Sequence, residues 1–296
     1  MIANSASSTL PRFLKEKLAA YVAFTKLRLT SLVVVSSVIG YGIGAVNFSW
    51  IEVLWLSLSG VLVTGASNGF NQVIERDFDA LMSRTKNRPL PTGKMGVMES
   101  LVFATAMGIT GLVVLYFVFN PLAAVLGALA LFSYVLIYTP MKRVSSLAVF
   151  VGAFPGAIPP MLGYVAATAD FDLYAGLLFA IQFMWQFPHF WAIAWVSHDD
   201  YKKAGYHLLP SKGKDGQTAF LTFLYTLFLI PVSLLPWAFD LVSGYAAVAL
   251  ALSGLLFAWP AIKLLRKKND AAAKTVMFAS FFYLPIAQLI LLIDKF

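Results

Sequence analysis

This sequence predicts an all-helical membrane protein with about nine transmembrane helices. Of its 296 residues, 59% are hydrophobic and 12% are charged, whereas soluble globular proteins carry roughly 25% charged residues. The hydrophobic residues form runs close to the ~20 residues that a helix needs to cross the hydrocarbon core of a bilayer. A third observation, the position of Lys and Arg between those runs, predicts how the helices are oriented.

Nine apolar segments follow one another along the chain. They cover residues 29–46, 51–74, 99–119, 122–139, 146–167, 173–196, 218–238, 241–264 and 273–294. Polar turns at Asn47–Ser49 and Asn120–Pro121 separate neighbouring segments. We therefore expect one transmembrane domain over residues 29–296, preceded by an N-terminal segment over residues 1–28.

The N-terminal segment is polar and basic and lacks the pattern of a cleavable signal peptide. Ser8 and Thr9 precede Pro11, which predicts the capped start of a short amphipathic helix on the membrane surface. The chain contains no Cys, which excludes disulfides and thiolate metal sites.

Basic residues are strongly segregated if the chain has nine spans. All but one of the 22 Lys and Arg residues then lie on one side, before the first span or after the second, fourth, sixth and eighth. Lys295 falls opposite, where the loops carry acids such as Asp170, Asp172 and Asp240. The positive-inside rule predicts a multi-pass protein of the cell (inner) membrane, with the N-terminus and the basic loops in the cytoplasm. The net charge of +8 reflects this topology, and we expect no nucleic acid partner.

The stretch from Asn71 to Lys94 places acids and arginines directly after the second apolar run. Charge at that depth is costly, which indicates function. Four polar residues are spaced by three or four positions and share one helix face, namely Asn68, Asn71, Glu75 and Asp79. Asp77 points elsewhere. Oxygen ligands beside a basic loop suit Mg²⁺ bound to a phosphate group. The alternative is an ordinary interfacial helix end whose acids pair with Arg76, Arg84 and Arg88.

A second loop resembles the first. After the second span the chain reads Asp77-Phe78-Asp79 and then Leu90-Pro91-Thr92-Gly93-Lys94. After the sixth it reads Asp199-Asp200-Tyr201 and then Leu209-Pro210-Ser211-Lys212-Gly213-Lys214. Four spans separate the two loops, which predicts two pseudo-related halves of four helices plus a ninth helix, with both acid clusters facing one central cavity.

The sixth span carries its own polar face. Gln182, Gln186 and His189 recur at helical spacing, and on an unbroken helix Asp200 would lie within roughly 20° of His189. A kink at Pro188 would change that registry. Such a face is expected to point into the bundle. A single His in a helix is nevertheless more often structural than a ligand.

Two basic pairs suit phosphate binding but have an equally good alternative. Lys142 and Arg143 follow the fourth span, and Lys26 and Arg28 enter the first. Arg binds phosphate oxygens in bidentate fashion and Lys supplies a point charge. Both pairs would also serve simply to orient the protein in the membrane.

Taken together, these motifs resemble those of the UbiA superfamily of intramembrane prenyltransferases. The first motif, NxxxDxxxD, stands here as Asn71, Glu75 and Asp79, with Glu in place of the middle Asp. The RTxNRPLPTG run is present from Arg84 to Gly93. A YTxxKR-like element follows as Tyr138, Thr139, Lys142 and Arg143, and the TKPR element reads Thr25-Lys26-Leu27-Arg28. The sequences Trp185-Gln186-Phe187-Pro188-His189 and His198-Asp199-Asp200-Tyr201 are similar to those of the branch that farnesylates haem.

The resemblance implies nine helices around a central cavity that opens to the cytoplasmic side and to lipid. It implies transfer of a farnesyl group from farnesyl diphosphate to a vinyl group of haem b, which gives haem O and diphosphate. The expected partners are these two substrates, the lipid bilayer and the assembly pathway of a terminal oxidase. The alternatives are a quinone-precursor prenyltransferase and, from a different class, a transporter, which would place its charges nearer the midplane.

The resemblance also assigns roles to residues. It implies Mg²⁺ as a cofactor, held by Asn71, Glu75, Asp79, Asp199 and Asp200. Neutralisation of the leaving diphosphate is expected from Lys142, Arg143 and Arg88, with Asp199 and Asp200 also in the catalytic set. Substrate contacts are expected from Asn68, Lys26, Arg28, Arg84, Tyr138, Gln186, His189 and Lys203.

Overall fold

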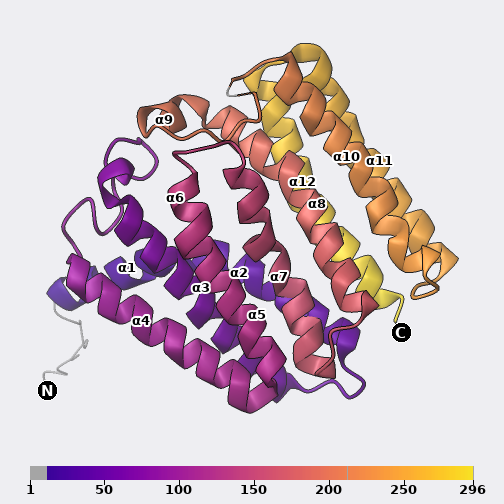
Figure 1. Cartoon of the computed structure of the whole chain (residues 1–296), viewed down its shortest axis with the longest axis horizontal. Helices are drawn as coiled ribbons and strands as arrows, with labels where there is room; N and C mark the ends of the chain where they lie inside the picture. The colour runs from indigo at the N-terminus through magenta and orange to yellow at the C-terminus, as the bar shows by residue number, and fades with distance from the viewer. Residues whose placement is uncertain (1–11, 212, 296) are drawn as a thin grey trace, which may run out of the picture.

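The structure, a computed structural model, describes residues 12–211 and 213–295, and for Arg12 and Phe13 it describes the backbone alone. Within this part of the chain every regular element is a helix (Figure 1). The cap predicted at Ser8 and Thr9 and the basic residue Lys212 lie outside the described residues.

Each of the nine apolar segments forms a long helix. The first two are α2 (Leu27–Gly44) and α3 (Trp50–Asp79). The next two are composite: α4 (Val97–Val114) continues as η1 (Leu115–Phe119), and α5 (Pro121–Phe132) continues as η2 (Ser133–Tyr138) and α6 (Thr139–Met141). The other five are α7 (Ala148–Thr168), α8 (Leu173–Val196), α10 (Gly216–Ala238), α11 (Gly244–Lys267) and α12 (Asp270–Ile293).

Among the described residues, eight of these helices are long and apolar enough to cross a membrane. The ninth, α8, has 24 residues but carries Gln182, Gln186 and His189 on one face. It packs against α7, α10 and α12, so its polar side chains meet protein rather than lipid. The predicted class, an all-helical membrane protein with about nine spans, is confirmed.

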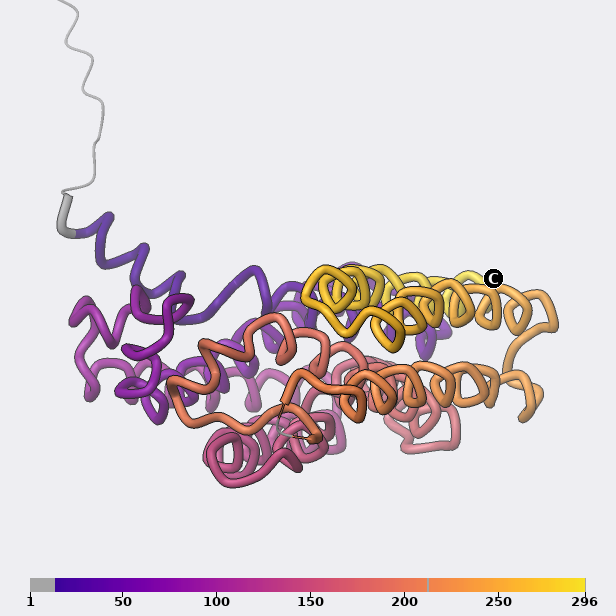
Figure 2. Tube along the Cα trace, turned by 90° about the horizontal axis from the view of Figure 1, so that it is seen from above, coloured from indigo at the N-terminus to yellow at the C-terminus, as the bar shows by residue number. Residues whose placement is uncertain are grey.

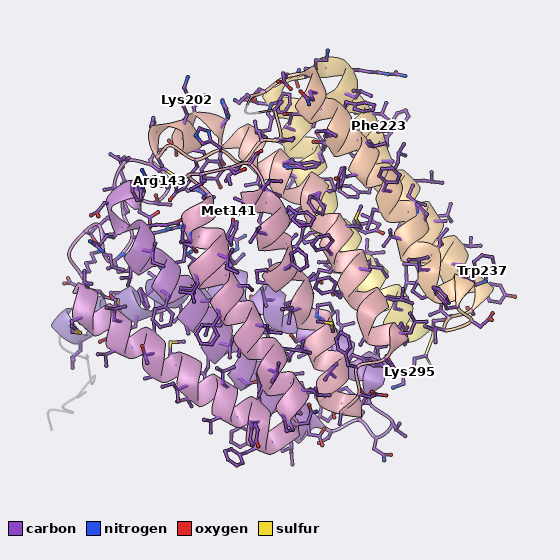
Figure 3. The ribbon with its side chains drawn as sticks, viewed as in Figure 1. Met141, Arg143, Lys202, Phe223, Trp237 and Lys295 are labelled. Carbon is purple, nitrogen blue, oxygen red and sulfur yellow. The ribbon has the colours of Figure 1, made fainter. Side chains whose placement is uncertain are left out.

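Two short helices lie outside this set. The helix α1 (Arg12–Thr25) extends from one edge of the bundle (Figure 2), and Lys26 separates it from α2 with a left-handed backbone, φ 50° and ψ 51°. The helix α9 (His198–Lys203) lies at the same end of the bundle as α6 (Figure 1). Arg143 and Lys202 are found at that end, whereas Trp237 and Lys295 lie at the opposite end (Figure 3).

Polar side chains define where many of the helices begin. A side-chain oxygen at the position before the helix accepts a hydrogen bond from a backbone N–H of the first turn, which satisfies a donor that the helix itself leaves free. This capping occurs at Ser49, Asn120, Asp172, Asp215, Ser243 and Asn269. The turns predicted at Asn47–Ser49 and Asn120–Pro121 thus end one span and start the next.

Small residues bring α2 and α7 into close contact. A Cβ atom added at Gly40 would lie 1.9 Å from the Pro160 carbonyl oxygen, and one added at Gly163 would lie 1.8 Å from the Ser37 carbonyl oxygen. Backbones approach this closely only where side chains are absent, which is the usual way in which membrane helices associate. The α2–α7 contact therefore fixes two helices that lie far apart in the sequence against each other.

Candidate active site

The four polar residues predicted to share a face of α3 are all buried. Asn68, Asn71, Glu75 and Asp79 have relative exposures of 4% or less. Asp77 is instead largely exposed and pairs with its neighbour Arg76 at 3.5 Å. The helical spacing therefore separated the buried acids from the exposed one, since side chains three and four positions apart lie on the same side of a helix.

Glu75 is paired with Lys142. The Lys142 ammonium donates to Oε1 of Glu75 at 2.8 Å, and the two side chains are 9% and 5% exposed. The ammonium also lies 4.7 Å from the ring centre of Tyr138 and 5.8 Å from that of Tyr206. Burial is the largest single influence on Lys142 and would lower its pKa, but the Glu75 carboxylate together with Tyr134 and Tyr201 raises that pKa overall. Lys142 therefore carries a full positive charge beside the acid row.

An irregular helix end places Lys142 there. The π-helical segment η2 precedes Pro140, which has no N–H for a regular helical bond. The Thr139 hydroxyl donates to the Tyr134 carbonyl at 2.9 Å and accepts from the Asn71 amide at 3.2 Å. Widened turns of this kind occur often at functional sites.

Asp79 is paired with Arg88. A guanidinium N–H donates to Oδ2 at 2.6 Å, and the Asp79 side chain is fully buried. The other oxygen, Oδ1, is buried and has no hydrogen-bond partner among the described residues. The 80–96 connection that carries Arg88 is fixed by the Thr85 hydroxyl, which donates to the Asp79 carbonyl at 2.8 Å. Asp79 therefore pairs with Arg88, as the alternative interpretation expected, and its second oxygen stays without a hydrogen-bond partner among the described residues.

Lys26 reaches the same row from the junction of α1 and α2. Its left-handed backbone ends α1 and turns the side chain inward, so that Nζ lies 3.4 Å from Oδ1 of Asn68 and 3.5 Å from Oδ1 of Asn71. Burial lowers the pKa of Lys26 well below its usual value, and the nearby Arg88 and Lys142 cations lower it further. Arg28, two residues later, is exposed and lies outside this cluster.

The two loops that looked alike in sequence contact each other directly. The Ser83 hydroxyl donates to Oδ2 of Asp200 at 2.5 Å, and Lys203 donates to Oδ1 at 3.1 Å. Arg84 donates to the Tyr201 hydroxyl at 2.9 Å. The bonds from Ser83 and Lys203 lower the pKa of Asp200 to about 2. Asp200 therefore ties the second loop to the first as a carboxylate.

Asp199 points away from this contact. Its side chain is 85% exposed and lies 3.8 Å from the Lys214 ammonium. Asp199 and Asp200, though adjacent, thus serve different connections. Among the described residues no cluster of three or more acids and histidines is close enough to form a metal site from protein groups alone.

Arg143 also diverges from its neighbour Lys142. Its guanidinium lies 4.0 Å over the Phe78 ring, a cation–π contact. It lines a cavity of about 400 Å³ whose other walls are Ile74, Glu75, Phe78, Thr139, Pro140, Val144 and Tyr206. Lys142 faces the buried acids, whereas Arg143 stacks on Phe78 and lines a mostly apolar cavity that Glu75 also lines.

The polar face of α8 divides between two neighbours. Gln186 donates to the Ala153 carbonyl of α7 at 2.8 Å. His189 instead faces α12, where Nδ1 lies 2.7 Å from Oγ of Ser280. The unbroken helix from His189 to Asp200 does not form, because α8 ends at Val196 and the backbone leaves helical geometry at Ser197. Pro188 lies inside α8 and does not end it.

A model of the UbiA prenyltransferase family matches residues 33–284. The chain belongs to the UbiA prenyltransferase family. It is 49% identical to the protoheme IX farnesyltransferase of Christiangramia forsetii over 94% of each chain, and 48% identical to that of Flavobacterium psychrophilum over 99% of each.

Solved structures support the UbiA fold. A structure of digeranylgeranylglyceryl phosphate synthase gives a TM-score of 0.79, at 20% identity over 95% of this chain and 99% of that one. A UbiA homolog from Archaeoglobus fulgidus bound to GPP and Mg²⁺ gives 0.67, at 13% identity over 92% and 99%. At these identities the likeness establishes the fold alone.

Three residues of this UbiA-family site were not among the predicted site residues. Tyr206 covers Lys142, Thr139 holds Asn71, and Ser83 binds Asp200. Each is a common residue type in a loop or at a helix end. Ser83 and Thr139 directly precede or lie within recognised motifs, so their position was a usable signal, whereas Tyr206 lies outside every motif.

The acid row of this UbiA-family chain has the donor set that Mg²⁺ prefers. Asn71, Glu75 and Asp79 present amide and carboxylate oxygens on one buried face, and Oδ1 of Asp79 has no partner among the described residues. Mg²⁺ takes few ligands from protein and completes its octahedron with water and substrate phosphate. The residues present therefore fit the ion.

Proposed function

We propose that this chain transfers a farnesyl group from farnesyl diphosphate to a vinyl group of haem b, with haem O and diphosphate as products. The observation that carries the proposal is a row of buried carboxylates at one end of an apolar helix bundle, where each carboxylate is paired with a cation. The choice of haem as acceptor is supported by relatives named protoheme IX farnesyltransferase at 48–49% identity over nearly the whole chain.

The cations of the site suit a leaving diphosphate. Lys142, Arg88 and Lys26 converge on the acid row from three different segments. Fixed charges aimed at the atom where negative charge grows stabilise a dissociating transition state. Arg84 is engaged with Tyr201, and Arg143 stacks on Phe78 in the wall of the cavity that Glu75 also lines. We expect Lys142 and Arg88 to contribute most and Arg143 less.

Asn71, Glu75 and Asp79 are the residues that would hold Mg²⁺. The ion, when bound, neutralises diphosphate oxygens and thereby assists departure of the leaving group. Asp200 is a candidate for a second ion only if it leaves Ser83, and Asp199 only if it leaves Lys214. We also propose contacts with the substrates for Asn68, Arg28, Tyr138, Gln186, His189 and Lys203.

The bond changes balance with one water molecule. The C1–O bond of farnesyl diphosphate breaks, and both electrons leave with diphosphate. The terminal vinyl carbon of haem b supplies the electron pair for the new C–C bond to C1. Water adds to the carbon next to the ring and loses a proton, which gives a hydroxyethylfarnesyl group. The apolar interior suits the farnesyl chain, while the charged helix ends keep the diphosphate near water.

We further propose that the basic end of the bundle faces the cytoplasm in the cell (inner) membrane. Arg143 and Lys202 lie at that end and Lys295 at the other (Figure 3), and the positive-inside rule favours this orientation. The N-terminal segment 1–28 and the active-site loops would then be cytoplasmic, and the product would be available to the assembly pathway of a terminal oxidase.

Mass spectrometry of the product tests the acceptor. The purified chain, supplied with farnesyl diphosphate, Mg²⁺ and haem b, is expected to give a haem whose mass has increased by a farnesyl group and one hydroxyl group. A prenylated quinone precursor in its place would establish the rival prenyltransferase. Failure to release diphosphate with either acceptor would favour the transporter class.

A further inference from the structure

A chain of hydrogen bonds joins α8 to α12 at Ser280. The ring nitrogen Nδ1 of His189 lies 2.7 Å from Oγ of Ser280. The Ser280 hydroxyl in turn donates to the Met277 carbonyl at 2.6 Å. The indole N–H of Trp185, one turn before His189, donates to the Ser280 carbonyl at 2.9 Å. Ser280 is completely buried, so this arrangement is shielded from competing donors.

The direction of these hydrogen bonds determines which ring nitrogen of His189 carries the proton. A serine hydroxyl has a single hydrogen, and here it is given to the Met277 carbonyl. Oγ of Ser280 therefore accepts, and Nδ1 of His189 must carry the hydrogen. A neutral imidazole has one N–H, so Nε2 keeps a free lone pair. Among the described residues, no protein group is hydrogen-bonded to Nε2.

The surroundings of His189 suit a flat aromatic ligand. The Trp185 ring is stacked on the imidazole with centres 4.4 Å apart and planes 20° apart. Phe190 and Phe281 present their edges at 5.3 and 5.1 Å. His189 is 7% exposed, but Phe281 is 40% exposed, so the aromatic cluster is open on one side.

His189 also lies at a useful depth. It precedes the end of α8 at Val196 by seven residues, which is roughly 10 Å along the helix axis. The acid row of α3 ends at Asp79, at the same end of the bundle, because Ser83 beyond α3 bonds Asp200 beyond α8. A macrocycle held at His189 would therefore lie in the apolar part of the bundle, below the charges that bind diphosphate.

We propose that Nε2 of His189 coordinates the iron of the tetrapyrrole substrate, and that Ser280 is the positioning residue that keeps the imidazole in the coordinating tautomer. The inference rests on the proposed function, which supplies an iron-containing substrate. Metal-bound histidines usually donate their other N–H to such a partner, and loss of the partner weakens metal binding about 10- to 100-fold. Nothing in the sequence links Ser280 to His189, which lies 91 residues away.

The test combines haem binding with spectroscopy on the full-length protein in detergent. Haem b is titrated into the wild type and into His189→Ala, Ser280→Ala and Ser280→Thr, and the iron–histidine stretching band is recorded by resonance Raman. Ser280→Ala is expected to weaken haem binding about 10-fold and to shift the band, because the imidazole loses its acceptor. Ser280→Thr keeps the hydroxyl and should resemble the wild type.

Ser59→Ala is the matched control. Ser59 is also completely buried, and its hydroxyl also donates to the carbonyl three residues earlier, at 2.9 Å, but it lies on α3 and has no histidine partner. A loss of packing alone would affect both serine variants alike and would leave the iron–histidine band in place. A shift of the iron–histidine band in Ser280→Ala but not in Ser59→Ala therefore identifies loss of the His189–Ser280 hydrogen bond as the cause.

Each outcome decides the proposal. A wild type with no iron–histidine band, or a His189→Ala variant that retains the band, overturns the assignment of His189. A band that stays unchanged in Ser280→Ala overturns the role of Ser280. The proposed function is tested separately, because a wild type that shows the band but forms no farnesylated haem would remove the function and leave the haem site standing.

Discussion

The buried ion pair between Lys142 and Glu75 allows a prediction about stability that is independent of catalysis. The two charges are 2.8 Å apart, and the side chains are 9% and 5% exposed. Lys142→Met leaves the Glu75 carboxylate buried without its cation. Because removal of one partner of a buried pair costs about 3–5 kcal/mol, we expect a loss of that size in the free energy of unfolding.

A double variant distinguishes the loss of the ion-pair attraction from the cost of leaving the Glu75 carboxylate buried without a partner. Replacing both partners of a buried pair by uncharged groups is often neutral. Lys142→Met combined with Glu75→Gln should therefore be more stable than Lys142→Met alone by about 2 kcal/mol or more, a clear departure from additivity. The physical reason is that Gln has no net charge to desolvate, although it fills nearly the same volume.

Equilibrium unfolding in mixed detergent micelles, followed by tryptophan fluorescence, measures these differences. Lys203→Met is the control, because Lys203 pairs with Asp200 at 3.1 Å but is 57% exposed, and exposed pairs contribute roughly 0–1 kcal/mol. A loss below about 1 kcal/mol for Lys142→Met, or strictly additive effects in the double variant, would refute the argument that burial makes this pair energetically important.

Three further predictions concern catalysis, packing and pH. Asp79→Asn should lower kcat/KM for farnesyl diphosphate by about 100-fold or more, whereas Asp77→Asn, at an exposed position, should match the wild type in a diphosphate-release assay. Equal activities of the two variants would remove Asp79 from the proposed metal site. Gly163→Ala would place a Cβ 1.8 Å from a carbonyl oxygen of α2 and should lower the free energy of unfolding by at least about 1–3 kcal/mol. Gly176→Ala, whose new Cβ would meet no atom within 4 Å, should be neutral or slightly stabilising in the same micelle assay. The pKa of Asp200 is lowered to about 2. The contribution of its carboxylate to the stability of the loop contact is therefore complete above its ordinary pKa of ~4 and is lost only as pH falls through about 2. Hydrogen exchange in the 80–96 connection, corrected for its intrinsic pH dependence, should show constant protection from about pH 8 to 5, and a loss of protection in that range would contradict the role of Asp200 in this contact.

Local patterns were enough to predict the helices and the acid row. A span is a property of about 20 consecutive residues, and the shared face of Asn71, Glu75 and Asp79 follows from the helical repeat alone. Both were therefore available without any knowledge of how the helices pack. The buried position of these residues agrees with the expectation that charge inside a membrane protein faces the bundle.

The directions of adjacent side chains at a helix end could not be predicted from such local patterns. Lys142 and Arg143 looked like one phosphate-binding pair, yet one faces Glu75 and the other stacks on Phe78. Consecutive side chains at the end of a helix point about 100° apart, and the packing around them decides which one enters the site.

The sequence by itself determined the approximate number of spans, the segregation of charge and the identity of the buried acids on α3, because each depends on local composition or helical period, whereas the expectation that Asp199 also faces the cavity was wrong. Only the tertiary structure decided which cation pairs with which acid, that Asp200 binds Ser83, and that His189 meets Ser280. These contacts join residues far apart in the chain. Their geometry depends on how helices such as α2 and α7 or α8 and α12 pack, and no local pattern encodes that packing.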